Sequence, residues 1–362
     1  MAKEHAGIGE EERTLLRDTV RGLLTERWPV ERAVERSYDP AAVTRIWQSL
    51  AAQGLTKLGF DPEEGGLREI LLVFEELGRA SCPAPLLGAV MVSLLARGQR
   101  AASDDLAGLC AALHSGSAVA AVAFGAFDGD AAAGQVSFAG GAVSGCAAFV
   151  ENAATATHYV LFTDAPTGVV VLPAGAVMTV TPTPGLAVPA LSELSFAGTN
   201  AALVEVSAAR LAELAEVARL CCAARALGAA QRGFELALEH AKLRKQFGQF
   251  IGQFQAIQHK LADCLTRLDG ARLTLDAAAT GFDRAFDNWR VFAAAALAYA
   301  GPALRQVVLE SHHTMGAIGY AEEHEMPRHF RRIHADLARF GGAHRARAEL
   351  ADYLLGPAAS SR

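Results

Sequence analysis

Along the first 114 residues, apolar side chains recur every three or four positions, which is the spacing of amphipathic helices. Three stripes stand out, formed by Leu15, Val20, Leu23 and Leu24, by Val43, Ile46, Trp47 and Leu50, and by Ile70, Leu71, Phe74 and Leu77. Pro29 and the pair Asp39-Pro40 separate the first two, and Gly78 is expected to end the third helix. The pattern predicts an N-terminal helical domain over residues 1–114.

Between residues 115 and 205 the pattern changes to short runs rich in Val, Thr, Phe and Gly, with few charges. The strand-like runs are 135–138, 158–162, 168–172 and 177–181. Turn signals separate them, among them Gly140-Gly141 and the segment 182–185. We therefore expect a middle β-domain of short antiparallel strands over residues 115–205.

From residue 206 to the end the helical period returns, in segments longer than the N-terminal ones. Ser207 is a plausible N-cap for a helix that reaches about Phe247. Further helices are expected over 254–280 and 288–315, the last with a kink at Pro302. Long helices with wide apolar faces predict a four-helix bundle over residues 206–362. The predicted fold is mainly α with a central β-domain.

Composition and charge narrow the possible functions. The chain has 362 residues, 51% of them hydrophobic and 20% charged, with a net charge of −6, so it is expected to be globular and to bind no nucleic acid. Its six cysteines show no CxxC pair and no metal-ligand spacing, which predicts free thiols in a reducing compartment and no metal. The N-terminus has no apolar signal region, and the longest apolar run, 291–304, is shorter than the about 20 residues that span a bilayer. We expect a cytoplasmic protein with no membrane partner.

Three strings of residues resemble the acyl-CoA dehydrogenases, flavoproteins that oxidise the Cα–Cβ bond of acyl-CoA thioesters. They are GL at 54–55 with PEEGGL at 62–67 and FEELGRA at 74–80; RKQFG at 244–248 with IGQFQAIQHKLAD at 251–263; and MGAIGY at 315–320 followed by Arg331-Arg332. The strings occur in the family's order and span most of the chain. The resemblance implies the same three-part fold, an FAD cofactor and an oligomer.

The resemblance also implies cofactor-binding residues. Arg244 matches the arginine that reaches the FAD pyrophosphate across a subunit boundary, Phe247 the ring that packs on the ADP moiety, and Gln255 a hydrogen-bonding neighbour. Gly316 and Gly319 match a turn that lets the backbone approach the adenine end. Taken without the resemblance, these residues would fit a cation at a helix C-terminus, a core phenylalanine and a helix-end cap.

A catalytic base is missing from both places where relatives carry one. Many relatives have Tyr-Glu-Gly-Thr shortly after the C-terminal arginine, and this chain has Arg339-Phe340-Gly341-Gly342 there. The alternative position on the long helix is Ala218. Neither side chain accepts a proton, so the catalytic residue stays unidentified. The glutamates that could serve as a relocated base are Glu216, Glu322, Glu323 and Glu325.

Strings that contact the flavin ring in relatives are also replaced. The Leu-Thr-Glu and Gly-Ser-Asp strings give way to residues 121–130, Trp-Ile-Thr gives way to Phe149-Val150-Glu151, and His313 stands where many relatives have Gln. The half of the site that a subunit lends to a neighbour's ADP is therefore kept, and the half that holds its own flavin ring is not.

This asymmetry leads to several hypotheses. The first is a subunit of a two-chain acyl-CoA dehydrogenase whose partner, a second chain of the same type, supplies the base, with electron-transfer flavoprotein or another acceptor taking the electrons. The others are a self-sufficient dehydrogenase with a relocated glutamate, a non-catalytic scaffold, and a flavin-independent elimination or cyclisation.

Overall fold

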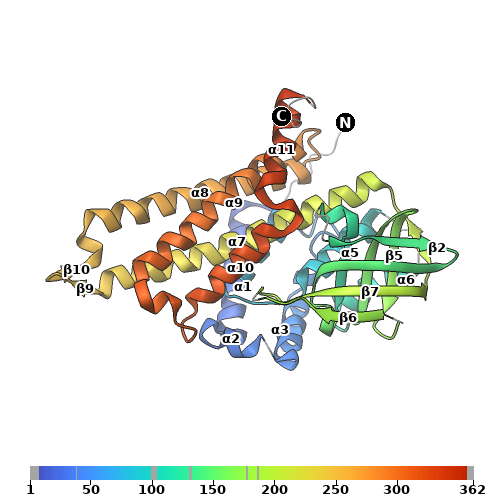
Figure 1. Ribbon diagram of the computed structural model, residues 1–362, viewed down its shortest axis with the longest axis horizontal. Helices are drawn as coiled ribbons and strands as arrows, with labels where there is room; N and C mark the ends of the chain where they lie inside the picture. Colours follow the sequence, from blue (N-terminus) through green and yellow to red (C-terminus); the bar gives the residue numbers. More distant parts are fainter. Residues whose placement is uncertain are drawn as a thin grey trace.

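The computed structural model describes residues 8–356 apart from residues 38, 99–103, 130–132, 177 and 186. A β-domain occupies one end of the molecule, and the long C-terminal helices extend from it to the opposite end (Figure 1). The N-terminal helices pack against the part of these helices nearer the β-domain. The fold class is therefore as predicted, mainly α with a central β-domain.

The N-terminal region consists of short helices that bury their apolar stripes. Its α-helices are α1 (Glu10–Arg27), α2 (Ala33–Arg36), α3 (Pro40–Ala52), α4 (Leu67–Arg79), α5 (Leu86–Gly98) and α6 (Asp104–His114). The three predicted stripes lie on α1, α3 and α4. The prediction that Gly78 ends its helix is wrong, because α4 continues through it to Arg79. Gly78 lies instead where α4 crosses α7 (Ala208–Leu243), and a Cβ on it would come within 1.8 Å of the Arg225 carbonyl oxygen.

The β-domain contains two four-stranded sheets, with strand orders β1-β4-β5-β8 and β2-β3-β7-β6. The strands are β1 (Ala120–Ala123), β2 (Val136–Ala139), β3 (Ala142–Glu151), β4 (His158–Asp164), β5 (Thr167–Pro173), β6 (Met178–Pro182), β7 (Leu191–Asn200) and β8 (Leu203–Glu205). The four predicted runs correspond to β2, β4, β5 and β6, although position 177 lies outside the described residues. All pairings are antiparallel except β1 with β4, which is parallel and corrects the prediction of a purely antiparallel unit.

Five α-helices form the C-terminal region: α7, α8 (Gln255–Asp283), α9 (Trp289–Met315), α10 (Met326–Ala338) and α11 (Gly342–Leu355). Ser207 caps α7 as predicted, its Oγ accepting a hydrogen bond of 3.3 Å from the Arg210 amide. The helix α7 packs against α4, α8, α9 and α10 and so forms the centre of the molecule.

Two details of these helices differ from the sequence prediction. The helix α7 ends at Leu243, four residues before Phe247, and the chain then forms a small hairpin of β9 (Lys245–Gln246) and β10 (Gln249–Phe250).

The segment from Trp289 to Tyr320 is long and apolar enough to cross a membrane by length and composition. Half of its most apolar window is buried, and α9 packs against α7, α8 and α11, as a core helix does.

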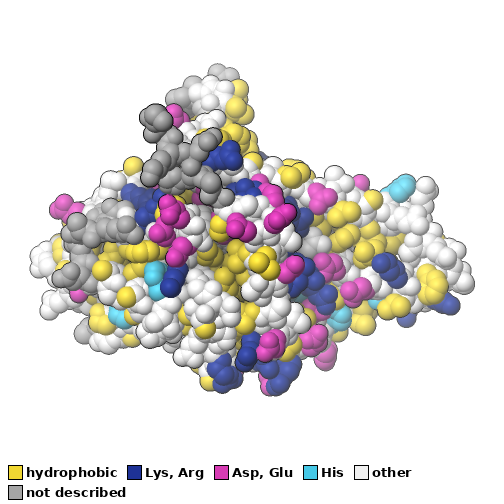
Figure 2. Space-filling model, turned by 180° about the vertical axis from the view of Figure 1, so that it is seen from behind, with side chains coloured by type: hydrophobic (Ala, Val, Ile, Leu, Met, Phe, Trp, Pro, Cys, Tyr) yellow, Lys and Arg dark blue, Asp and Glu magenta, His cyan; other side chains and the backbone are white. Residues whose placement is uncertain are grey.

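The surface and the cysteines agree with the composition argument. Acidic and basic side chains alternate over the face seen in Figure 2, without a continuous basic stripe on that face. All six cysteines are free, and five of them are buried. The prediction of free thiols is therefore confirmed.

Candidate cofactor site

The hairpin at the tip of the C-terminal helices has an unusual turn. Phe247 and Gly248 connect its strands with φ angles of 51° and 81°, the left-handed values of a type I′ turn. Asn-Gly and Gly-Gly are the preferred pairs for such a turn, because a non-glycine residue at positive φ is strained. A phenylalanine is therefore not the residue that hairpin formation would select.

The side chains of this hairpin point to solvent. Phe247 is 93% exposed, and its ring lies edge-on to the Phe254 ring, 6.3 Å away between centroids. Arg244 is exposed as the C-cap of α7, and within the described part of the chain its guanidinium has no ion pair or hydrogen bond. Gln255 is also exposed, at the start of α8. Hydrophobic and basic side chains gather at this tip (Figure 2). A guanidinium fork and a bare aromatic ring suit a phosphate next to a planar group.

The glycine turn after α9 lies at the same end of the helices. The helix α8 begins beside the hairpin and α9 returns alongside it, so the turn η7 (Gly316–Tyr320) faces the hairpin end (Figure 1). Gly316 has φ 62°, and a Cβ there would meet no atom within 4 Å. Gly319 is buried, and a Cβ on it would lie 3.1 Å from Met315 Cβ and 3.5 Å from His312 Nδ1. Gly316 is thus open to a ligand, whereas Gly319 is explained by packing alone.

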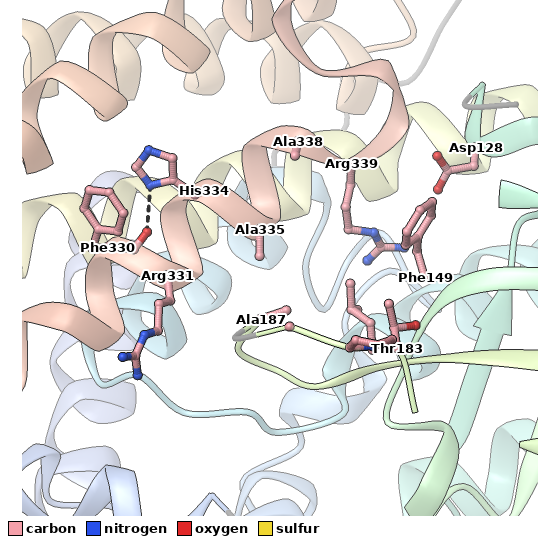
Figure 3. Close-up of a pocket in the computed structure, with 13 residues that line it drawn as sticks. Asp128, Phe149, Thr183, Ala187, Phe330, Arg331, His334, Ala335, Ala338 and Arg339 are labelled. Carbon is pink, nitrogen blue, oxygen red and sulfur yellow. Dashed lines mark hydrogen bonds between the residues drawn. The ribbon is translucent and has the colours of Figure 1, made fainter. Parts of the chain in front are cut away.

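A pocket of about 440 Å³ lies between the β-domain and α10 (Figure 3). Its described lining residues are Asp128, Phe149, Thr183, Pro184, Gly185, Ala187, Leu191, Phe330, Arg331, His334, Ala335, Ala338 and Arg339. Phe149 and the guanidinium of Arg339 face each other at its inner end. Apolar walls with a few cationic groups could accept a planar or aliphatic group with an anionic end.

Arg339 belongs to a group of four buried charged side chains, the other three of which are not among the described lining residues. Glu151, at the end of β3, accepts hydrogen bonds of 2.6 and 3.0 Å from Arg225 on α7 and one of 2.5 Å from Arg339. Arg225 also donates to Asp336 on α10 at 2.5 and 2.9 Å. We call Glu151, Arg225, Asp336 and Arg339 the charge cluster.

Burial and the neighbouring arginines oppose each other at the two carboxylates of the charge cluster: burial prevails at Asp336 and raises its pKa, whereas the arginines prevail at Glu151. Burial acts to raise the pKa of Glu151, but Arg225 and Arg339 outweigh it and lower this pKa to about 2. Glu151, Asp336 and Cys222 bring ligand atoms within 4.8 Å of one another, as a metal site would. The Arg225 guanidinium already binds both carboxylates, so the cluster is neutralised by arginine and the prediction of no metal stays a prediction.

The comparisons with known proteins identify the family. The N-terminal domain of the acyl-CoA dehydrogenases matches residues 10–106, and their C-terminal domain matches residues 208–352. The acyl-CoA dehydrogenase IpdE2 of Mycobacterium tuberculosis is 31% identical over 337 residues, which cover 90% of this chain and 91% of IpdE2. The chain belongs to the acyl-CoA dehydrogenase family.

Solved structures of the family share the fold over nearly the whole chain. A variant of the Tcur3481–Tcur3483 steroid acyl-CoA dehydrogenase superposes with a TM-score of 0.85 at 25% identity, covering 96% of this chain and 99% of that one. A chain of the ChsE4–ChsE5 complex from Mycobacterium tuberculosis gives a TM-score of 0.83 at 24% identity, covering 96% and 98%.

In this member of the family, an aromatic ring is buried at the position that the sequence resemblance matches to the base of many relatives. Phe340 is 1% exposed and meets the edge of the Phe124 ring at 5.0 Å between centroids. Its backbone has φ 55°, and its amide donates to Asp128 Oδ1 at 3.2 Å. Ala218, the alternative position, is fully buried in α7. Neither position offers a proton acceptor.

Of the four glutamates considered as relocated bases, three form ion pairs away from the pocket. Glu216 forms an ion pair of 2.6 Å with Arg219, and Glu322 pairs with Arg331. Burial opposes ionisation of Glu325, yet hydrogen bonds from His329 and Arg232 lower its pKa to about 2, too low for a base at neutral pH. Glu323 is exposed. None of these four glutamates is among the described residues that line the pocket.

The charge cluster was not predicted from the sequence. There Glu151 is only a departure from a family string, and Arg225 and Asp336 belong to none of the strings that resemble the family. The available signal was local: Arg225 is a charge inside a segment of α7 that is buried on all sides. Such a residue is rarely fully buried unless it is paired.

Proposed function

We propose that this chain is one subunit of a two-chain acyl-CoA dehydrogenase, and that its hairpin holds the ADP end of an FAD whose ring lies mainly on the partner chain. The observation that carries this proposal is the exposed Phe247 at a left-handed turn position, close in sequence to an Arg244 whose guanidinium has no partner among the described residues. Folding accounts for neither feature, whereas a dinucleotide from outside the chain accounts for both.

The residues of this chain would divide the work as follows. Arg244 binds the diphosphate, Phe247 packs on the ADP moiety, Gln255 donates a hydrogen bond nearby, and the turn from Gly316 to Gly319 approaches the adenine. When bound, FAD accepts the hydride that leaves the β-carbon of the acyl-CoA. The partner chain supplies the base that removes the α-proton, because Phe340 occupies the corresponding place here.

Two further points support an assembly of two different chains. The structurally similar Tcur3481–Tcur3483 steroid acyl-CoA dehydrogenase is named for two components. An exposed cofactor-binding tip also has a use only across an interface, and closed assemblies are the rule for soluble oligomers. The electrons would pass to electron-transfer flavoprotein or a similar acceptor, and the site of action would be the cytoplasm.

The second candidate function is a non-catalytic scaffold that keeps the fold and needs no flavin. The buried Phe340 in place of a base favours it, since a scaffold needs no proton acceptor. It leaves the exposed hairpin unexplained, so we rank it second.

The visible spectrum of the purified protein tests both readings. We expect the chain alone to be nearly colourless and inactive, and the complex co-purified from its native host to be yellow and to oxidise acyl-CoA. A yellow, active preparation of the chain alone would show a self-sufficient dehydrogenase. A complex without flavin absorbance even after FAD is added would show a scaffold.

A further inference from the structure

The charge cluster connects three parts of the molecule that are distant in sequence. Glu151 ends β3 in the β-domain, Arg225 lies in the middle of α7, and Arg339 directly follows α10. The hydrogen-bonded pairs are 74, 111 and 188 residues apart along the chain. The cluster therefore connects the β-domain to the C-terminal helices through buried side chains, in addition to contacts such as the Phe340 amide to Asp128.

The charge cluster is balanced and shielded from water. It contains two carboxylates and two guanidiniums, each less than a tenth exposed. A further buried arginine, Arg332, donates to the Cys82 carbonyl at 3.2 Å and bonds none of the four. Removing one member leaves an unpaired buried charge, whereas removing one of each sign keeps the balance.

The charge cluster also holds Phe340 in place. Arg339 precedes it, and the guanidinium lies 4.7 Å from the centre of the Phe340 ring. On its other sides, Phe340 is held by its amide bond to Asp128 and by the Phe124 ring. Two of the replaced family positions, Glu151 and Arg339, bind each other, so these departures form one connected unit.

We propose that Glu151, Arg225, Asp336 and Arg339 form an interdomain lock, which holds the β-domain on the C-terminal helices and keeps Phe340 where relatives carry a base, so that the cleft of this chain is not a dehydrogenase centre. This proposal concerns only the cleft within this chain. It does not depend on whether the hairpin binds an FAD that is seated on a partner chain.

A double-mutant cycle on the full chain tests the lock. Glu151→Gln leaves one excess buried cation, Arg339→Met leaves one excess buried anion, and the double variant is balanced. We expect each single variant to lower the Tm by several degrees and the double variant to lose less than the sum of the two. The control cycle is Glu35→Gln with Arg32→Met, an exposed ion pair of 3.4 Å near the start of α2, for which we expect small, additive changes.

Each other outcome of the cycle overturns the lock. Single variants as stable as the wild type, or losses that simply add, would show that the four side chains do not act as a unit. If a single variant fails to fold, the lock still requires the double variant to recover folded protein. Free FAD titrated into the purified Arg244→Ala, Phe247→Asn chain, which lacks the proposed hairpin contacts, is expected to give no saturable change in flavin fluorescence, and saturation at one FAD per chain would show that the cleft is a working flavin site.

Discussion

Replacing Phe247 by asparagine is expected to remove most of the flavin from the assembled complex while leaving this chain as stable as before, or slightly more stable. Asparagine followed by Gly248 is a preferred pair for the type I′ turn that the hairpin adopts, so the substitution relieves strain. It also removes the exposed ring. Stacking on an aromatic side chain contributes about 1–3 kcal/mol per base, which corresponds to about a 5- to 150-fold loss of FAD affinity.

The hairpin proposal requires Arg244→Ala to add to this loss. A hydrogen bond to a charged group contributes about 1.5–3 kcal/mol, so the double variant should bind FAD about 10²- to 10³-fold or more weakly. Flavin absorbance per complex and the Tm of the isolated chain measure the two effects separately. Phe286→Ala and Arg347→Ala remove exposed residues of the same types elsewhere and should leave flavin content unchanged.

The outcome that contradicts the proposal is also specific. Full flavin occupancy in the Phe247→Asn, Arg244→Ala double variant would mean that the hairpin does not hold the cofactor. A loss of flavin accompanied by unfolding of the chain would not support it, and the asparagine substitution is chosen to prevent that result.

Much of the fold could be predicted because many elements alternate apolar with polar residues or end at clear turn signals. The helices α1 and α3 contrast buried with exposed positions, α4 alternates apolar with charged residues although nearly all of them are buried, and the strands β4 and β5 end at turn signals. The helix α5 was not predicted as a separate element, and its residues 86–96 are all buried, so no polar face marks its period. The end of α7 was placed too late because Phe-Gly is not a typical turn pair.

The candidate site divides in the same way. The hairpin residues could be found because they form a continuous string, 244–263, that resembles a family. The charge cluster could not, since its members come from segments 74 to 188 residues apart and nothing in the local sequence says which acid meets which arginine. The sequence alone showed that both base positions lack a proton acceptor. Only the structure shows the buried Phe340 ring and the Glu151 carboxylate that is paired with Arg225 and Arg339.

Two glycines let α4 and α7 pack closely. The sequence suggested that Gly78 ends a helix, but Gly78 and Gly228 lie where α4 crosses α7, each against the backbone of the other helix. A Cβ on Gly228 would lie 1.7 Å from the Glu75 carbonyl oxygen and 2.9 Å from the Arg79 amide. Backbone atoms cannot rotate away as a side chain can, so the two helices would have to separate.

Gly228→Ala is therefore expected to destabilise the chain by about 3 kcal/mol, the upper part of the usual range for overpacking. Gly233→Ala, on the same helix, is the matched control: its Cβ would lie 3.3 Å from the flexible end of Met326, and alanine favours a helix over glycine by about 0.5–1 kcal/mol. In denaturant unfolding, Gly228→Ala should lower the free energy of unfolding by about 3 kcal/mol, whereas Gly233→Ala should leave it unchanged or raise it slightly. Equal stabilities would mean that the crossing is loose, and then α7 could not hold Arg225 of the charge cluster rigidly against the β-domain.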